Sequence, residues 1–553
     1  MLASEPPCAP RLSLSRRSLL RAAGIAGAAG LASPLIATEG MRGFTHGVAS
    51  GEPSANSVLL WTRHVGAQDA AIEWQVSETM DFARTAAAGT VRAGPESDWC
   101  CKATVQDLQP GRWYYYRFIA PGGETSCIGR TRTLPEGPTE RFRMAVFSCS
   151  NIGFGWFNAY AHAAEAGDID LAVHTGDYFY EYPPGTYPSM EEALPGRPIA
   201  PAAETIALAD YRLRHASYRA DPDLQRLHQL YPMVLGWDDH ESANDSYVDG
   251  AENHQPETEG PWSVRKAAAK RAYREWLPVS DAPWAAYDIG DLATLFRLDT
   301  RLTARSRPPS LGEIIRGKQS NDEMVAALEQ YRDGAYLDPA RTMLGGTQEA
   351  WLADGLERSR RGGKAWQVLH QQVVMGSVFS PPALAGALPD DLPDYIRQRL
   401  TVTAMAGQAG LPFNMDAWDG YPAARERLLR ASLDADANLL VLAGDTHNAW
   451  AFELDHEGAP AGVEFAGQSV TSPGFEGYLS SVPSPLLEAG LVRGNRQLGW
   501  ANLSQRGYMM VELTPERAAS EYRFLSGVRE RSTRLAATKR ISTAVGSHTL
   551  DIG

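Results

Sequence analysis

Short apolar runs in this sequence end in residues whose side chains can hold a cation. Two of these runs, 144–147 and 171–174, have the length and composition of buried strands, and the segment 156–166 between them predicts a helix. In such a β-α-β unit the strands are parallel, and the loops at their carboxyl ends form the ligand crevice. We therefore expect three donor side chains to converge there: the thiolate of Cys149, the carboxylate of Asp177 and the phenolate of Tyr180.

Cysteine, aspartate and tyrosine each have commoner structural uses, so the prediction of a metal site depends on finding further donor residues at the ends of later strands. Four later runs with strand character, 231–237, 293–298, 366–369 and 438–443, also end in polar or ionisable residues. Because the carboxyl ends of such strands meet, we predict one shared site. In chain order, the residues that follow these runs are Asp239, His240 and Asn244; Arg301; His370; and Asp445 and His447.

These donors could hold two cations if one carboxylate bridges them, and Asp177 is the natural bridge. Two metal ions about 3.5–4 Å apart polarise a phosphoryl oxygen and create a hydroxide at neutral pH. His240 would stabilise charge or protonate the leaving oxygen without binding metal. Arg301 could clamp a phosphate, and a structural salt bridge with Asp299 is an equal alternative.

The chain of 553 residues is too long for one ordinary core. Residues 43–134 carry short strands between turn clusters, which predicts a seven-strand sandwich like fibronectin type III. Residues 141–525 alternate strands and helices, which predicts a layered α/β domain. We expect the Pro-rich segment 182–201 to be an insertion over the site. After a last strand at 507–513 we expect helix-prone residues and a C-terminal tail, 526–553.

The first 37 residues resemble a twin-arginine export signal, with Arg16-Arg17 before a run rich in Ala and Gly. The run is too short and too Gly-rich for a membrane span. We therefore predict export by the twin-arginine machinery to the periplasm or the medium. In that oxidising space one disulfide, between Cys127 and either Cys100 or Cys101, is plausible.

The formal net charge of −14 disfavours general binding to nucleic acids or to anionic membranes. A cysteine phosphatase is excluded for Cys149, because the Arg expected six residues later is Gly155. A P-loop kinase is excluded because the phosphate-binding motif is missing.

Six motifs in order resemble the PhoD-type alkaline phosphatases, within the calcineurin-like metallophosphoesterases. They are SCSN, HTGDYFYEY, WDDHE, LDTR, AGDTHNAW and SVTSPG. The resemblance covers almost the whole chain, including the N-terminal HGVASGEP segment, and it implies an α/β (α+β sandwich) metallophosphatase fold. The segment DAWDGY at 416–421 also resembles the family, as a wall of the mouth.

Carried over by position, the resemblance implies one Fe³⁺ held by Cys149, Asp177, Tyr180 and His447. It also implies one or two Ca²⁺ ions, held by Asp177, Asp239 and Asp445, with Asn244 as a further candidate. His240 and Arg301 are the expected catalytic side chains. His370 matches no family position and is interpreted as a core histidine rather than an outer-shell donor.

The expected function is hydrolysis of small or polymeric phosphate esters by a monomeric, exported enzyme. The expected step is in-line attack of a metal-held hydroxide. A diesterase or phospholipase D-like activity on the same fold is the first alternative. An exported binding protein with an inert metal site is the second.

Overall fold

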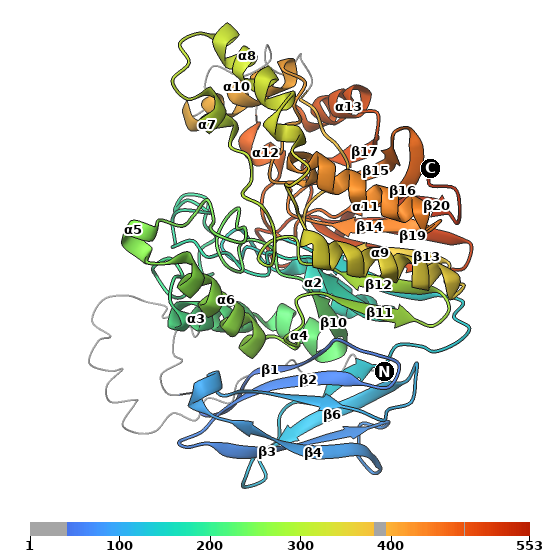
Figure 1. The fold of residues 1–553 in the computed structure, drawn as a ribbon. Coiled ribbons are helices and arrows are strands. Elements are labelled where there is room, and N and C mark those ends of the chain that lie inside the picture. Colours follow the sequence, from blue (N-terminus) through green and yellow to red (C-terminus); the bar gives the residue numbers. More distant parts are fainter. Residues whose placement is uncertain (1–40, 381–393, 481) are drawn as a thin grey trace.

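The computed structural model describes residues 41–380, 394–480 and 482–553. Their strands form sheets of nine, seven and four strands. Figure 1 shows the four-stranded sheet at the bottom and the larger sheets with their helices above it. The predicted export signal, residues 1–37, lies outside the described residues. Among those residues, no helix is both long and apolar enough to cross a membrane.

The region 43–134 contains seven strands, the number that the sequence predicts. Four of them form the sheet of order β4-β3-β6-β7, and the other three form one edge of the nine-stranded sheet. Buried side chains such as Leu60, Ile72 and Phe118 pack between the two groups. The strands are β1 (Gly43–Gly51), β2 (Val58–Val65), β3 (Ala70–Ser77), β4 (Thr85–Ala93), β5 (Cys100–Val105), β6 (Trp113–Ile119) and β7 (Gly129–Arg132).

The nine-stranded sheet has the order β20-β19-β18-β8-β9-β10-β1-β2-β5. Its central strands β8, β9 and β10 are mutually parallel, as the β-α-β interpretation requires. Strand β1 pairs in parallel with β10 at Ser50 and Gly51, which joins the N-terminal region to this sheet. The remaining strands are β8 (Phe142–Phe147), β9 (Leu171–His174), β10 (Pro232–Leu235), β18 (Gly507–Leu513), β19 (Arg517–Leu525) and β20 (Leu535–Ala544).

The seven-stranded sheet has the order β11-β12-β13-β14-β16-β15-β17. Strands β12, β13, β14 and β16 are parallel neighbours, and the flanking strands are antiparallel. The strands are β11 (Ala285–Ile289), β12 (Ala293–Arg297), β13 (Trp366–His370), β14 (Leu439–Ala443), β15 (Ala449–His456), β16 (Ala459–Ala466) and β17 (Leu498–Asn502).

The two large sheets pack face to face and are covered by helices on their outer faces. In β8, Met144 and Val146 point into the core between the sheets, whereas Ala145 and Phe147 point toward the helices. Both faces are therefore buried, which explains the unbroken apolar runs in the sequence. The helices over the nine-stranded sheet are α2 (Asn158–Ala166), α3 (Leu208–Arg219), α4 (Pro222–Leu230) and α6 (Trp262–Trp276).

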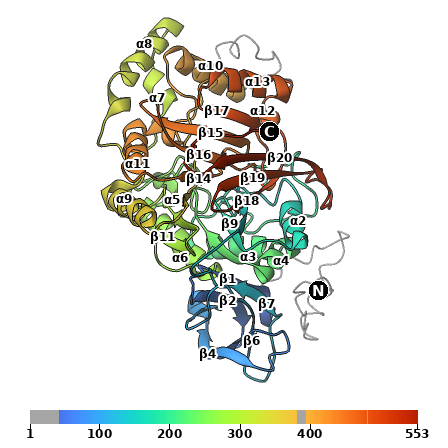
Figure 2. The same cartoon turned by 90° about the vertical axis from the view of Figure 1, so that its right-hand side faces the viewer.

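Three helices cover the seven-stranded sheet, and a further group packs beyond it. Figure 2 shows α9 and α11 on one side of the paired sheets and α2 on the other. The covering helices are α9 (Gly345–Arg361), α11 (Pro422–Asp434) and α13 (Ser484–Gly494). A separate cluster joins α7 (Leu311–Ile315), α8 (Asn321–Arg332) and α10 (Asp394–Gln408), and α5 (Pro256–Glu259) and α12 (Phe475–Tyr478) are single turns.

The predicted break at Asp221-Pro222-Asp223 separates α3 from α4. The Asp221 side chain accepts hydrogen bonds from the backbone N–H groups of Asp223 and Leu224 and so caps α4, with Pro222 in the first turn. The predicted helix-prone tail is wrong, because residues after Leu513 form β19 and β20. Strand β20 pairs with β19 along its whole length, since alternation in this segment places Ile541 in the core between the sheets.

The expected disulfide is also wrong, because Cys100 and Cys101 carry free thiols. Both lie on β5, where their side chains are buried.

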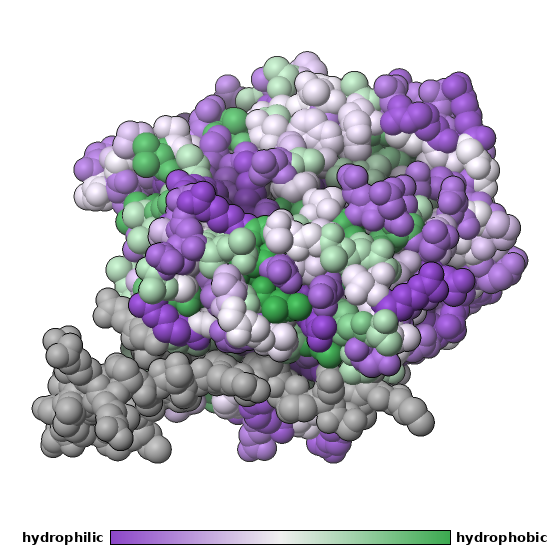
Figure 3. All heavy atoms as spheres, turned by 90° about the horizontal axis from the view of Figure 1, so that it is seen from below, coloured by the Kyte–Doolittle hydropathy of each residue, from purple (hydrophilic) through white to green (hydrophobic). Residues whose placement is uncertain are grey.

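Figure 3 shows the lower face of the molecule, where hydrophobic side chains lie in small patches separated by hydrophilic ones.

Candidate metal centre and active site

Loops at the ends of three parallel strands and of β14 bring the predicted ligands together. The donor atoms of Cys149, Asp177 and His447 all lie within 4.8 Å of one another. A second group with the same spacing contains Asp177, Asp239 and His240, so Asp177 belongs to both. Residues more than 290 positions apart in the chain thus lie together, and Asp177 is shared between two donor groups.

Tyr180 lies in the first of these groups. Its hydroxyl donates to Asp177 Oδ2 at 3.1 Å and lies 3.1 Å from His447 Nε2. Ser472, which the sequence did not single out as a site residue, donates to the Tyr180 oxygen at 2.8 Å. The thiol of Cys149, the carboxyl of Asp177, the phenol of Tyr180 and the imidazole of His447 therefore lie together.

Backbone conformation marks the same residues. Cys149, Asp177, Asp445 and His447 have φ between 55° and 64°, the left-handed region that residues with a Cβ rarely occupy. Each follows a buried strand, and the positive φ turns the chain sharply there. Strain of this kind costs about 1–3 kcal/mol per residue and clusters at functional sites. Four instances among the predicted ligands indicate that side-chain placement is maintained against local backbone preference.

Acidic residues beyond the predicted ones extend the site. Asp238, Asp239 and Asp445 form a third group, and Asp239, Asp245 and Asp416 form a fourth. Asp245 directly follows the predicted ligand Asn244, and its backbone N–H donates to Asp239 Oδ2 at 2.7 Å. The Asn244 side-chain amide donates to Glu252 Oε2 at 3.2 Å. Asp416 comes from the DAWDGY segment, so that segment supplies an acid to the site.

Burial makes this concentration of negative charge unfavourable without a cation. Burial raises the pKa of the Asp177 carboxyl well above its usual range, and the neighbouring acids Asp239, Asp238 and Glu241 raise it further against the opposing effect of His240. Asp177 Oδ1 is buried and has no hydrogen-bond partner among the described residues. Burial also raises the pKa of the Cys149 thiol, and Asp177 adds to that effect. These residues fit a bound cation, which would supply the missing partner and the compensating charge.

His447 is held in the tautomer that a metal ligand needs. Its Nδ1 lies 2.8 Å from the carbonyl oxygen of Pro473, an acceptor, so Nδ1 carries the proton. Nε2, which faces Tyr180, is left with its lone pair. Burial lowers the pKa of His447 to about 3, which keeps the imidazole neutral.

His240 is paired with an acid that the sequence did not single out. Its Nδ1 lies 2.6 Å from Glu181 Oε2, and Glu181 is fully buried. Burial alone would lower the pKa of His240, but Asp239, Glu181 and Asp177 together raise it well above its ordinary value. These acids therefore favour the imidazolium form of His240, in which Nε2 can donate a proton.

Arg301 is fully buried among carboxylates. Its guanidinium pairs with Asp238, with Asp416 at 2.5 Å and with Asp445 at 3.0 Å. The alternative of a salt bridge with Asp299 is wrong, because Asp299 Oδ1 instead accepts the backbone N–H of Arg301 at 2.9 Å. With its N–H groups already directed at three acids, Arg301 positions those acids and balances their charge.

Glu241 and His370 support the site from behind. Glu241 accepts hydrogen bonds from the backbone N–H groups of Asp177, Tyr178 and Asp238, which ties the β9 loop to the β10 loop. His370 is fully buried, and its Nε2 lies 3.0 Å from the His174 carbonyl oxygen. Burial lowers its pKa to about 3, which agrees with the interpretation as a core histidine.

The Pro-rich segment 182–201 lies at the site, as predicted. The ring of Tyr187 stacks on His447 with a centroid distance of 6.4 Å and an interplanar angle of 19°. Beside it, Phe154, Pro473 and Arg506 line a cavity of about 540 Å³. Because Pro473 also contacts His447, this cavity lies next to the first group of donors.

Comparison with known proteins identifies the family of this chain. The family model described as "PhoD-like phosphatase" matches residues 144–522, and the one described as "PhoD-like phosphatase, N-terminal domain" matches residues 30–135. Alkaline phosphatase D of Bacillus subtilis (strain 168) is 32% identical over 513 residues, which cover 88% of this chain and 78% of that protein. A solved structure described as "Structure of PhoD" is 29% identical, with a TM-score of 0.73 and 92% of each chain covered.

The matched region spans both the sandwich and the layers that carry the donor groups. The chain therefore belongs to the PhoD-like phosphatase family and is a phosphoric ester hydrolase.

Proposed function

We propose that this phosphatase is an exported, metal-dependent enzyme that hydrolyses phosphate mono- or diesters with two kinds of cation. The observation that carries this proposal is the pair of adjoining donor groups that share Asp177. One group offers a thiolate, a phenolate and an imidazole, and the other groups offer carboxylates. A single metal would not need two donor sets of such different character.

The donor chemistry favours different metals for the two groups. Cys149, Tyr180 and His447 with Asp177 suit Fe³⁺, because thiolate and phenolate are strong anionic donors. Asp239 and Asp445 suit Ca²⁺, because this ion prefers carboxylate oxygens. Asp245 and Asp416 add further carboxylates to this side and could hold a second Ca²⁺.

The protein's own side chains would orient the ester and transfer a proton. When bound, the cations would supply Lewis acidity toward the phosphoryl oxygens and acidify a water molecule. His240 would donate its Nε2 proton to the leaving oxygen, and Glu181 would fix the imidazolium. Arg301 would keep Asp238, Asp416 and Asp445 in place rather than bind phosphate.

The first experiment measures metal content in variants that separate the two groups. We expect wild type to contain iron and calcium, Cys149→Ala to lose iron and retain calcium, and Asp239→Asn to lose calcium and retain iron. Both variants should lose at least about 10²-fold in kcat/KM, the range seen when a catalytic metal environment is lost. Cys100→Ala is the matched control, because Cys100 is also a buried free cysteine but lies on β5. Zinc alone, or full activity after chelation, would contradict the proposal.

A second measurement addresses the ester class. Turnover of p-nitrophenyl phosphate and of bis-p-nitrophenyl phosphate by the same preparation compares monoesters with diesters. Faster turnover of the diester would favour the phosphodiesterase or phospholipase D-like alternative. We further propose a monomeric state. We also propose twin-arginine export, which the Arg16-Arg17 pair in the sequence supports. Retention in the cytoplasm of an Arg16→Lys, Arg17→Lys variant would test the export route.

A further inference from the structure

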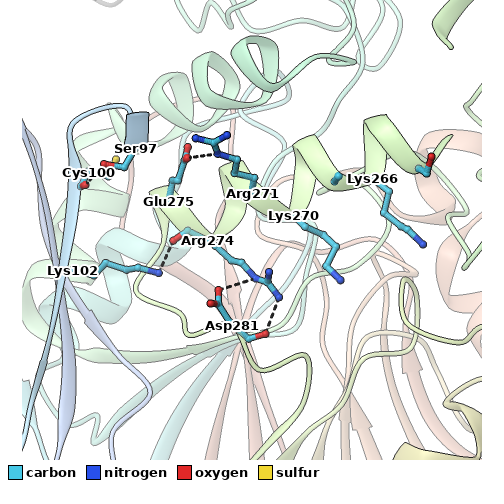
Figure 4. Close-up of a pocket in the computed structure, with 11 residues that line it drawn as sticks. Ser97, Cys100, Lys102, Lys266, Lys270, Arg271, Arg274, Glu275 and Asp281 are labelled. Carbon is cyan, nitrogen blue, oxygen red and sulfur yellow. Dashed lines mark hydrogen bonds and ion pairs between the residues drawn. The ribbon is translucent and has the colours of Figure 1, made fainter. Parts of the chain in front are cut away.

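A basic groove lies where the N-terminal region meets α6. It has a volume of about 620 Å³ and is lined by Ser97 and by residues of β5, of α6 and of the loop after α6. Its cationic side chains, labelled in Figure 4, are Lys102, Lys266, Lys270, Arg271 and Arg274. Its acidic side chains are Glu275 and Asp281. Five cations against two acids make the groove positive in a protein whose formal net charge is −14.

The register of α6 concentrates these cations on one side. Lys266, Lys270 and Arg274 follow one another at intervals of four residues, so they form a stripe along the helix, as Figure 4 shows. An adjoining face buries Ala269 and Tyr273 against the core. Like charges at this spacing destabilise a helix, so the stripe opposes the stability of α6 unless an anion lies beside it.

Among the cations of the groove, Lys270 gives the strongest reason to expect an anionic ligand. Its ammonium group has no hydrogen bond or ion pair among the described residues and lies 5.0 Å from the centroid of the Trp237 ring. Burial lowers its pKa from the ordinary value, and Arg274 and Lys266 lower it further, although Asp299 opposes them.

The neighbouring cations leave donors free to join Lys270. Lys102, which reaches in from β5, donates to the carbonyl oxygens of Arg274 and Val279 at 2.7 and 2.6 Å. An ammonium group has three protons, so one remains for a ligand. Glu275 is already shared between Arg212 and Arg271, and the Asp281 side chain is 88% exposed. The two acids pair with Arg271 and Arg274, so the three lysines carry the positive charge that no acid of the groove pairs with.

We propose that this groove binds a small polyanion that carries two or more phosphate groups, at a site apart from the catalytic donors. The volume is in the range of ligand pockets and exceeds the needs of one phosphate. Cations converge on it from two parts of the chain, so an anion with several charged groups could contact Lys102 and Lys270 together. None of the eleven lining residues belongs to the donor groups of the metal centre.

The groove also borders the loops that carry the metal centre. Lys266 donates to the carbonyl oxygen of Val248 at 2.6 Å, three residues after Asp245. Trp237, under the Lys270 ammonium, directly precedes Asp238. A polyanion in the groove would therefore contact the helix that braces these loops.

The test measures binding of methylenediphosphonate, whose P–C–P link is not an ester, by calorimetry at low salt. The protein carries Asp177→Asn so that hydrolysis cannot contribute. One screened charge is worth about 1 kcal/mol at contact in water, or about fivefold in affinity. We therefore expect Lys270→Ala to weaken binding about fivefold and Lys270→Glu about 25-fold. Orthophosphate should bind more weakly than the diphosphonate.

Lys318→Ala and Lys318→Glu are the matched controls, because Lys318 is an exposed lysine outside the groove. They should bind the diphosphonate with the affinity of the parent. Thermal unfolding of each variant checks that α6 remains folded. Equal affinity in the Lys270 and Lys318 series, or no saturable binding by the parent, would overturn the proposal. Because the Lys270 and Lys318 series share the same metal centre, a difference between them reports on the groove and not on the proposed catalytic metals.

Discussion

At the scale of single residues, His240 and Glu181 form the part of the site that this chain completes by itself. Glu181 accepts from His240 Nδ1 through Oε2 and from the Asn244 backbone and the Asn253 side chain through Oε1. Both of its carboxylate oxygens accept hydrogen bonds from neighbours, so the carboxylate is fixed in position. It therefore orients the imidazolium and maintains its charge.

We predict that Glu181→Gln lowers kcat about 10–100-fold, the effect typical of losing an orienting partner. The amide carries no charge and cannot raise the pKa of His240. The alkaline limb of the kcat profile, where His240 loses its proton, should therefore move to lower pH. Steady-state kinetics from pH 6 to 10 would show both effects. Glu257→Gln, an exposed change on α5, should alter neither. An unchanged profile in Glu181→Gln would remove His240 from the proton-transfer role.

The sequence predicts those site residues that directly follow recognisable strands. Cys149, Asp177 and Asp445 were found in this way, because an apolar run that ends in a donor is visible in one dimension. Glu181, Asp245 and Asp416 were missed as site residues, because they lie in irregular loops whose paths only the folded chain defines. The role of Arg301 was open for a similar reason, since its partners come from β10, β14 and the 416–421 segment.

At the scale of elements, the turns that end the parallel strands carry the placement of the ligands. Gly176 has φ of 131°, and a Cβ at this position would lie 2.4 Å from Asp238 Cβ. The β9 and β10 loops can approach this closely only with glycine here.

We therefore predict that Gly176→Ala destabilises the protein by about 2–4 kcal/mol through steric overlap and backbone strain. It should also lower bound metal, because Asp177 is displaced. Gly490→Ala is the matched control. Gly490 lies within α13, and its added Cβ meets nothing within 4 Å, so this change should stabilise the helix by about 0.5–1 kcal/mol. Denaturant unfolding and metal analysis compare the two. Equal stability of both variants would contradict the close-approach argument.

Strand β16 carries a buried acid that makes stability depend on pH. Glu464 accepts the backbone N–H groups of Met375 and Gly376 at 2.8 and 2.7 Å, and burial raises its pKa to about 7. In the unfolded chain the pKa of a glutamate is about 4.3. Between about pH 4.3 and about pH 7 the folded state therefore binds more protons than the unfolded state, so the contribution of Glu464 to the free energy of unfolding falls as pH rises. Glu464→Gln should therefore be more destabilising at pH 5 than at pH 8. Thermal unfolding of both proteins at the two pH values measures the difference, and a constant difference would refute it.

At the scale of the whole molecule, the C-terminal segment is part of the core. Ile541 of β20 packs between the large sheets, and Leu550 and Ile552 pack against the same cluster. The Leu550 backbone N–H also donates to Glu453 on β15, in the opposite sheet. The alternation of side chains in β20 is visible in the sequence. Because the segment has few large apolar residues, it was interpreted as a tail.

Deletion of residues 526–553 should consequently abolish soluble expression, because it exposes the edge of β19 and one side of the core. Deletion of 546–553 alone retains β20 and should give folded protein with a lower Tm. Expression, gel filtration and thermal unfolding of the two truncations provide the comparison. A well-folded, active protein ending at 525 would show that the segment is dispensable.

The position of β18 has a consequence for biosynthesis. This strand is the antiparallel neighbour of β8, although about 360 residues separate them in the chain. At a translation rate of about 5–20 residues per second, about 20–70 s pass between the synthesis of β8 and that of β18. The edge of β8 is unpaired for that whole interval and must be protected. Chaperone binding to the nascent chain would therefore be needed before release.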